Sequence, residues 1–126
     1  MSYYCGTDII EVDRVKKAIL STPGFKEKIF TPLEIEYADK KSDVTRFVHY
    51  AGRFAAKEAF SKALGTGITG FNLKDVFVQN DENGRPFLVV QNKASEILKN
   101  KFGECNIHIS LSHEKEFAIA FVVIES

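Results

Sequence analysis

The stretch RFAAKEAFSKALGTG, residues 53–67, has the composition of a helix but carries Glu58 where an apolar residue is expected. Successive residues of a helix advance by about 100°, so Glu58 falls on the face that Phe47 and Phe54 define. Lys62, one turn further on, lies about 40° beyond Glu58 at the edge of that face. The sequence therefore places a carboxylate and an amine beside an apolar surface.

Two interpretations of Glu58 are open at this point. In the first, Glu58 and Lys62 form an ordinary surface pair four residues apart, which stabilises a helix by about 0.3–0.5 kcal/mol. In the second, Glu58 is removed from water, which costs a carboxylate far more free energy than such a pair returns. A metal ion or a water-filled cavity would then have to offset that cost.

Asp8 favours the second interpretation. It follows Gly6 in GTDII at the end of a predicted strand, although an aspartate there could simply cap the following helix. Two carboxylates from separate elements are what Mg²⁺ typically receives from a protein when phosphates and water complete its coordination. A nearby lysine such as Lys62 suits a phosphate, because its ammonium group is a compact positive charge.

The rest of the chain alternates between helical and strand periodicity, which indicates the α+β class. The Asn-Gly dipeptide at 83–84 predicts a hairpin turn, and Thr31 with Glu34 predicts the start of a helix. Gly65 and Gly67 are expected to end the long helix. We expect a first strand ending near 8–11, helices over 11–20, 31–39, 44–64 and 93–103, a hairpin over 73–91 that turns at 81–84, and strands over 106–112 and 117–125.

Composition limits the class of protein. The 126 residues contain no linker or repeat, so we expect residues 1–126 to fold as a single domain. Lys+Arg and Asp+Glu both total 17, which argues against nucleic-acid binding through a basic surface. No apolar run is long enough to span a membrane, and residues 1–10 lack the pattern of a secretory signal. Cys5 and Cys105 have no metal-binding spacing, so we expect reduced thiols in a cytoplasmic protein.

The chain resembles the holo-[acyl-carrier-protein] synthases, the short 4′-phosphopantetheinyl transferases, in four motifs that occur in the same order: GTDIIEVDRV (6–15), FTPLEIEYA (30–38), GRFAAKEAFSKALGTG (52–67) and ISLSHEKEFAIAFV (109–122). The resemblance covers essentially the whole chain. It implies a fold in which an antiparallel sheet packs with a long central helix. It also implies a reaction of fatty acid biosynthesis, in which a serine hydroxyl of apo acyl carrier protein attacks the β-phosphate of coenzyme A and 3′,5′-ADP leaves.

The resemblance implies roles for two sets of residues. Asp8 and Glu58 match the acids that hold Mg²⁺ on the pyrophosphate, and Glu58 is also a candidate base for the serine, directly or through water. Lys62 matches the lysine that faces the transferred or leaving phosphate. The residues that match contacts to the nucleotide portion of coenzyme A are Arg53, Gly84, Arg85, Pro86 and His113. A simpler alternative for residues 84–86 is a turn that only reverses the chain. For His113 it is an exposed histidine between two strands.

The resemblance also implies protein partners. Family members receive the acidic acyl carrier protein on a basic first helix, where exposed ion pairs contribute about 0–1 kcal/mol each and mainly steer encounter. The matching residues are Arg14, Lys17, Phe25, Lys26 and Lys28, although a place in the core is equally open for Phe25. Family members are typically homotrimers with active sites at subunit interfaces. The strand 117–125, apolar on both faces, fits a buried sheet in such an assembly, and the core of a single chain would explain it too.

Two other functions compete with this transferase. A non-catalytic module that only binds carrier protein or coenzyme A would not require Asp8, Glu58 and Lys62 together. A related transferase that serves secondary-metabolic carrier proteins is commonly formed by two fused copies of the domain, so the chain length disfavours it. The choice between Mg²⁺ and Mn²⁺ stays open at this point.

Overall fold

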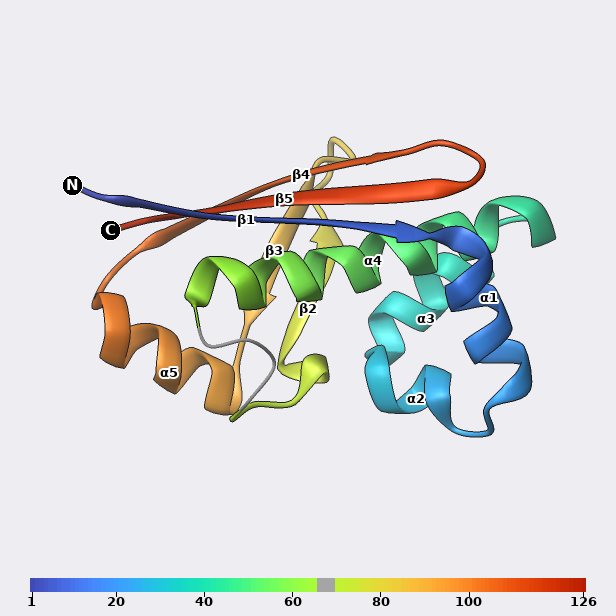
Figure 1. Cartoon of the computed structure of the whole chain (residues 1–126), viewed down its shortest axis with the longest axis horizontal. Helices are drawn as coiled ribbons and strands as arrows, with labels where there is room; N and C mark the ends of the chain where they lie inside the picture. The colour runs from blue at the N-terminus through green and yellow to red at the C-terminus, as the bar shows by residue number, and fades with distance from the viewer. Residues whose placement is uncertain (66–69) are drawn as a thin grey trace.

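A long helix lies along one face of an antiparallel sheet in the computed structural model, which describes residues 1–65 and 70–126 (Figure 1). The three-stranded sheet has the order β1-β5-β4, and β2 and β3 form a separate hairpin. The elements in chain order are β1 (Tyr3–Glu11), α1 (Val12–Ser21), α2 (Phe25–Ile29), α3 (Pro32–Asp39), α4 (Asp43–Leu64), the 3-10 helix η1 (Leu73–Asp75), β2 (Val76–Asn80), β3 (Pro86–Val90), α5 (Asn92–Phe102), β4 (Asn106–His113) and β5 (Phe117–Glu125). The described strands pair in antiparallel fashion, which confirms the α+β class with antiparallel sheets.

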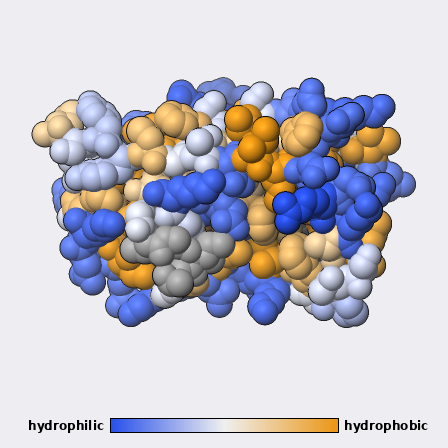
Figure 2. Space-filling model, in the orientation of Figure 1, coloured by the Kyte–Doolittle hydropathy of each residue, from blue (hydrophilic) through white to orange (hydrophobic). Residues whose placement is uncertain are grey.

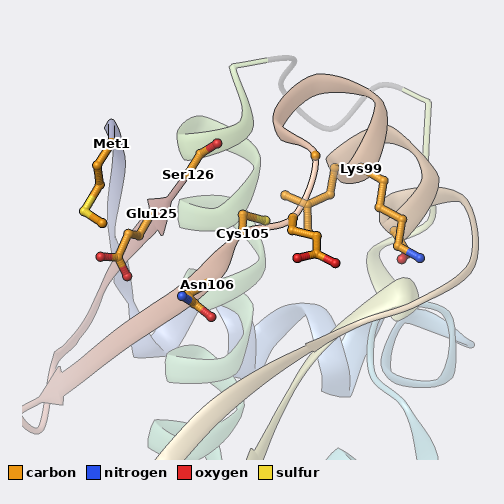
Figure 3. Close-up of a pocket in the computed structure, with 10 residues that line it drawn as sticks. Met1, Lys99, Cys105, Asn106, Glu125 and Ser126 are labelled. Carbon is orange, nitrogen blue, oxygen red and sulfur yellow. The ribbon is translucent and has the colours of Figure 1, made fainter.

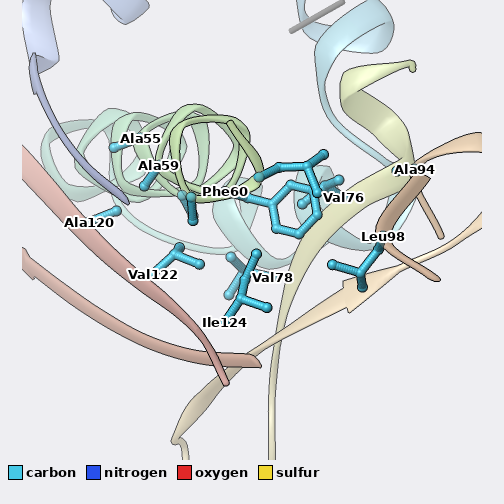
Figure 4. Packing of buried hydrophobic residues seen from close by; sticks show 13 residues of the cluster. Ala55, Ala59, Phe60, Val76, Val78, Ala94, Leu98, Ala120, Val122 and Ile124 are labelled. Carbon is cyan, nitrogen blue, oxygen red and sulfur yellow. The ribbon is translucent and has the colours of Figure 1, made fainter. Parts of the chain in front are cut away.

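Strand β5 separates buried from exposed side chains by strict alternation. Val122 and Ile124 are fully buried in the core between the sheet and α4, where they meet small residues of the helix such as Ala59 (Figure 4). Ile119 and Phe121 point to the other face and are 42% and 45% exposed. The expectation of a buried sheet is therefore met on one face only within a single chain.

Local signals set the ends of the helices as predicted. The Thr31 hydroxyl accepts a hydrogen bond from the Glu34 backbone N–H (3.2 Å), and the Glu34 carboxylate accepts one from the Thr31 N–H (3.0 Å). This capping box begins α3. Gly65 ends α4 in the left-handed conformation (φ 85°), and Gly67 lies outside the described residues. The sequence does not predict α2 and η1, because elements of five and three residues are too short to show a period.

Two observations bear on the expectations from composition. No helix within residues 1–65 and 70–126 combines the length and the apolar character that crossing a bilayer requires. Cys5 and Cys105 are free thiols, the first exposed and the second half-buried.

Candidate active site

Asp8 and Lys62 meet where β1 runs beside the C-terminal half of α4. The alternation along β1 turns Asp8 toward α4, together with the buried Gly6. Lys62 donates hydrogen bonds to Asp8 Oδ1 (3.1 Å) and to the backbone carbonyl of Thr7 (3.0 Å). The Asp8 side chain is 17% exposed and that of Lys62 is 56% exposed, so this ion pair lies at the surface. Lys62 thus pairs with Asp8, and the ordinary Glu58–Lys62 pair is not the arrangement observed.

Glu58 lies one turn before Lys62 on α4, and its charge interacts with that of Asp8. Partial burial raises the pKa of Glu58, and the charge of Asp8 raises it further, while Lys62 has the opposite effect. Two carboxylates whose charges interact in this way are a ligand set that favours a cation, since each ionised oxygen can accept but not donate. We therefore define Asp8, Glu58 and Lys62 as the acidic group of the site.

The residues of the acidic group fit a hard divalent metal whose remaining coordination positions are filled by a bound ligand. Within the described residues, no group of three or more His, Cys, Asp or Glu side chains could hold a metal ion. At this site the described residues therefore supply the two carboxylates of the acidic group, and phosphate oxygens and water would have to complete an octahedral shell. This donor set suits Mg²⁺ better than Zn²⁺, which prefers nitrogen and sulfur ligands.

Gly6 makes this meeting possible, because β1 passes directly against the backbone of α4. A Cβ at Gly6 would overlap the Ala59 carbonyl group and would lie 2.5 Å from the Ala63 nitrogen. Only glycine allows this approach, and the approach brings Asp8, two residues further on, to the helix. Sequence reasoning missed this role, although a glycine inside a strand pattern, two residues before a candidate ligand, is a signal for it.

Arg53 belongs to a different part of the molecule from the acidic group. It is 3% exposed, and its Nη2 donates to Asn80 Oδ1 (2.8 Å) at the end of β2. Its guanidinium lies over the Tyr37 ring of α3, 4.1 Å from the centroid. Its Nε has no hydrogen-bond partner among residues 1–65 and 70–126. A small hollow of about 250 Å³ is lined by Tyr37, Arg53 and Asn80 among others, so this buried cation borders a space that an anion could enter.

His113 reaches the same region from the end of β4. The His49 ring lies between those of Tyr37 and His113, at centroid distances of 5.4 and 5.7 Å, with both contacts edge-on. We define Tyr37, His49, Arg53, Asn80 and His113 as the basic-aromatic group. Tyr37, His49 and Asn80 were not identified from the sequence, where only the four-residue spacing of His49 and Arg53 hinted at a shared face.

Protonation of His49 is expected to destabilise the folded chain in acid. Burial, and then the charges of Arg53, Lys41 and His113, lower the pKa of His49 from 6.5 to about 4. The unfolded chain keeps the ordinary pKa, so this contribution to stability is complete above pH 6.5 and is lost as the pH falls toward 4. Between about pH 7 and pH 4.5 the melting temperature should fall less for His49→Gln than for the wild type. Equal falls would contradict this prediction.

The hairpin turn is connected to the basic-aromatic group through Asn80. Besides accepting from Arg53, the Asn80 side chain donates to the Gly84 carbonyl (3.0 Å). Gly84 adopts φ 83°, which the Asn-Gly dipeptide predicts, and Arg85 beside it is exposed. Pro86, half-buried, begins β3. The turn over residues 84–86 is therefore tied to Arg53 by a single intermediate side chain.

The acidic and basic-aromatic groups lie on different sides of α4. Glu58 and His49 are nine residues apart, which corresponds to half a turn around the helix and about 13 Å along it. Asp8 and His113 belong to β1 and β4, which are the two edges of the sheet with β5 between them. One chain therefore does not bring the two sets of predicted site residues together.

The predicted docking residues lie on and after α1. Arg14 and Lys28 are exposed. Lys17 pairs with a carboxylate one turn earlier on α1 (2.9 Å), and Lys26 pairs with one of α3 (3.5 Å). Phe25 is half-buried and packs against the core beneath α1 and α4. This favours a place in the core for Phe25 over a role in docking. Within the described residues, Arg14 and Lys28 are thus the two charged members of the set that form no ion pair.

A larger hollow of about 820 Å³ lies away from both groups, between α5 and the two ends of the chain (Figure 3). Cys105, Asn106 and Glu125 are among its lining residues, together with Met1. None of the predicted site residues lines it. Polar side chains that converge on one place identify a binding site better than the volume of a hollow does. We therefore place the candidate site at the two groups beside α4.

Comparison with known proteins gives matches along nearly the whole chain. A model of the 4′-phosphopantetheinyl transferase superfamily matches residues 4–122. The holo-[acyl-carrier-protein] synthase of Fusobacterium nucleatum is 47% identical over 119 residues, which cover 94% of this chain and 95% of that protein. That of Clostridium novyi is 45% identical over 120 residues, which cover 95% of this chain and 85% of that protein.

Solved structures match at the level of the fold. The holo-(acyl-carrier-protein) synthase of Bacillus anthracis, in complex with CoA (3′,5′-ADP), has a TM-score of 0.80 and 41% identity, with 98% of this chain and 96% of that chain covered. An ACPS-CoA complex from Chronobacterium ammoniagenes has a TM-score of 0.87 and 27% identity, with 99% of this chain and 98% of that chain covered.

Proposed function

The chain belongs to the 4′-phosphopantetheinyl transferase superfamily, and from this membership we infer that it is a holo-[acyl-carrier-protein] synthase. It transfers the 4′-phosphopantetheine group from coenzyme A to a serine of apo acyl carrier protein and releases 3′,5′-ADP, which is a step in fatty acid biosynthesis. The observation that carries the assignment of the site is the ion pair between Asp8 and Lys62, which lies one turn after Glu58 on α4. A module that only binds its ligands would not require two acids and a lysine at this place.

The acidic group supplies what the reaction asks of a protein. Asp8 and Glu58 would hold Mg²⁺, which when bound neutralises the diphosphate and the charge that grows on departing 3′,5′-ADP. Lys62 reaches the same place and would donate to a phosphate oxygen. A raised pKa also suits Glu58 to take the proton of the attacking serine, directly or through water. Phosphoryl-type transfer depends mainly on such positioning and charge stabilisation.

The basic-aromatic group and the turn over residues 84–86 would bind the nucleotide portion of coenzyme A. Arg53 and His113 would bind anionic groups, and the hollow beside Arg53 is lined in part by Asn80, which donates to the Gly84 carbonyl of the turn. Because these residues lie across α4 from the acidic group, we propose that each active site combines the acidic group of one subunit with the basic-aromatic group of the next. The assembly would be the homotrimer typical of the family, with residues 1–126 as one transferase domain and α4 as its central helix.

The open face of the sheet supports this assembly. Ile9 and Ile119 are paired across β1 and β5 and are 63% and 42% exposed, and Phe121 beside them is 45% exposed. Figure 2 shows hydrophobic groups in the upper middle of the molecule, where the sheet runs, with hydrophilic groups among and beside them. An apolar sheet face of this kind is typical of a surface that a second copy covers.

Two inactive variants are expected to restore each other's activity if the site is shared. Asp8→Asn damages the acidic group, and Arg85→Ala with His113→Ala removes two exposed side chains of the other half. In trimers assembled at random from equal amounts of both, roughly a quarter of the boundaries carry two intact halves. Transfer measured after joint refolding should therefore exceed that of either variant alone by severalfold. A mixture no more active than the two separate proteins would contradict the shared site.

The carrier protein is expected to dock on α1 through Arg14. Reversing this exposed charge with Arg14→Glu should raise the apparent KM for acyl carrier protein by about three- to tenfold, because exposed pairs contribute modestly. The KM for coenzyme A should change little. The matched control is Lys93→Glu, which reverses an exposed charge on α5. Equal changes in both KM values for Arg14→Glu would show that α1 is not the docking surface.

A direct test of the function mixes the protein with coenzyme A, Mg²⁺ and apo acyl carrier protein. Mass spectrometry of the carrier should show the added phosphopantetheine, and a chelator should abolish the addition. Replacing Mg²⁺ by Mn²⁺ after removal of the chelator tests which metal supports transfer. A carrier of unchanged mass under all conditions would overturn the assignment.

A further inference from the structure

Glu34 of α3 and Lys57 of α4 form an ion pair that is removed from solvent entirely. Lys57 Nζ lies 2.8 Å from Glu34 Oε1, and both side chains are 0% exposed. Burial lowers the pKa of Lys57, and the charge of Glu34 opposes this effect. Lys57 immediately precedes Glu58, yet neither member of the pair belongs to the acidic or the basic-aromatic group. The pair therefore needs an explanation of its own.

The hydrogen bonds of the pair converge on the backbone of η1 and β2. Lys57 also donates to the carbonyl groups of Leu73 (3.0 Å) and Val76 (2.7 Å), which uses all three N–H groups of its ammonium. The second oxygen of Glu34 accepts from the backbone N–H of Val78 (3.3 Å). The two side chains thus bind the strand that leads into the hairpin turn.

These contacts lie on the edge of β2 that faces away from β3. Successive residues of a strand direct their backbone groups to alternate edges. Asp75, next to Val76, accepts from the Gln91 N–H (2.8 Å) on the side of β3. Val76 and Val78 therefore point to the free edge, where Glu34 and Lys57 satisfy groups that another strand would otherwise bind.

The same pair connects the hairpin to the helix that carries Arg53. Lys57 lies one turn after Arg53 on α4, and β2 ends at Asn80, which binds both Arg53 and the Gly84 carbonyl. A shift of β2 along or away from α4 would move the turn relative to Arg53. The position of the proposed nucleotide-binding residues therefore depends on the strand that Glu34 and Lys57 hold.

Buried ion pairs are poor stabilising devices, because apolar residues of similar size often replace them without loss of stability. A better explanation for a buried pair with all its hydrogen bonds made is that it fixes one arrangement of the packed helices and strands among several. We propose that Glu34 and Lys57 are positioning residues for coenzyme A: they hold hairpin β2–β3 against α4 so that Arg53 and the turn over residues 84–86 bind the nucleotide together. This inference rests on the proposed function.

The test replaces both charges at once, so that neither is left buried alone. Glu34→Leu with Lys57→Met should fold, with a KM for coenzyme A raised at least about tenfold. The KM for acyl carrier protein, which docks on α1, should change less than about twofold. Direct calorimetric titration with 3′,5′-ADP, without metal or carrier, should show the same loss of affinity. A folded variant whose coenzyme A KM and 3′,5′-ADP affinity stay within about twofold of the wild type overturns the proposal.

A second pair of changes keeps the test decisive if the apolar variant does not fold. Glu34→Gln with Lys57→Gln retains hydrogen-bonding groups without charge and should give an intermediate rise of about threefold or more in the KM for coenzyme A. A KM unchanged in this variant overturns the proposal. The matched control is Glu36→Gln with Lys40→Gln, which removes an exposed pair of the same types (3.2 Å) beside α3 and should leave both KM values unchanged. Wild-type protein without transferase activity would instead refute the proposed function.

Discussion

Glu58→Gln is expected to abolish phosphopantetheine transfer while leaving the chain folded. The change replaces one carboxylate oxygen by an amide nitrogen of nearly the same size at a half-buried position, so packing is kept. It removes a charge that Mg²⁺ would need and the group proposed to take the proton of the serine. Loss of one such electrostatic contribution commonly costs about 10²–10³ in rate, and a residue with two roles should cost at least as much.

Three measurements separate this expectation from a folding defect. The melting temperature of Glu58→Gln should equal or exceed that of the wild type, because the repulsion from Asp8 is relieved. Calorimetric titration with Mg²⁺ in the presence of coenzyme A should show weakened metal binding. Glu36→Gln, an exposed substitution of the same type on α3, should retain full activity. A Glu58→Gln protein that is active and still responds to Mg²⁺ would refute the metal assignment.

Gly6→Ala is expected to be the most damaging substitution of a residue that touches no substrate. The added methyl group would overlap the backbone of α4 at Ala59 and Ala63, and backbone cannot rotate away as a side chain can. Overpacking of this kind costs about 1–3 kcal/mol and occasionally more, and we expect the upper end of that range. The displaced β1 would also carry Asp8 away from α4, so transfer should fall by at least about tenfold even where the protein folds.

Gly52→Ala is the matched control for this prediction. Gly52 is also buried and lies within α4, but a Cβ there would meet nothing within 4 Å. Alanine favours a helix over glycine by about 0.5–1 kcal/mol, so this variant should be slightly more stable than the wild type. Urea unfolding of both variants, with transfer assayed in parallel, gives the comparison. Equal stability of Gly6→Ala and the wild type would show that β1 can move without cost.

Local signals explain why much of the fold could be predicted. The capping box at Thr31 and Glu34, the left-handed Gly65 and the turn at Gly84 each depend on a few neighbouring residues, and each is found where it was expected. These three features need no knowledge of distant packing. That Asp8 and Glu58 share one metal site stays a prediction, which rests on an acid after a strand and an acid on an apolar helix face.

Contacts between distant elements could not be predicted in the same way. Lys62 pairs with Asp8 across 54 positions of the chain, and no local pattern indicates that choice over Glu58. The sequence around His49 does not indicate its contact with His113, which depends on the position of β4. Nothing in AAKEAF distinguishes Lys57 from an ordinary surface lysine, because its partner belongs to another helix. Such pairings depend on how helices and strands pack, which periodicity alone does not specify.

The placement of the two groups across α4 has a thermodynamic consequence. In the proposed shared site, coenzyme A would touch one subunit with its diphosphate and the next with its nucleotide, so it would be a crosslink as well as a substrate. Coenzyme A should then increase the affinity of the subunits for one another. Association of the subunits should increase their affinity for coenzyme A by the same factor, because linkage is reciprocal. Dilution in the absence of coenzyme A would loosen the assembly, and the cellular supply of the cofactor would govern how much of the protein is competent.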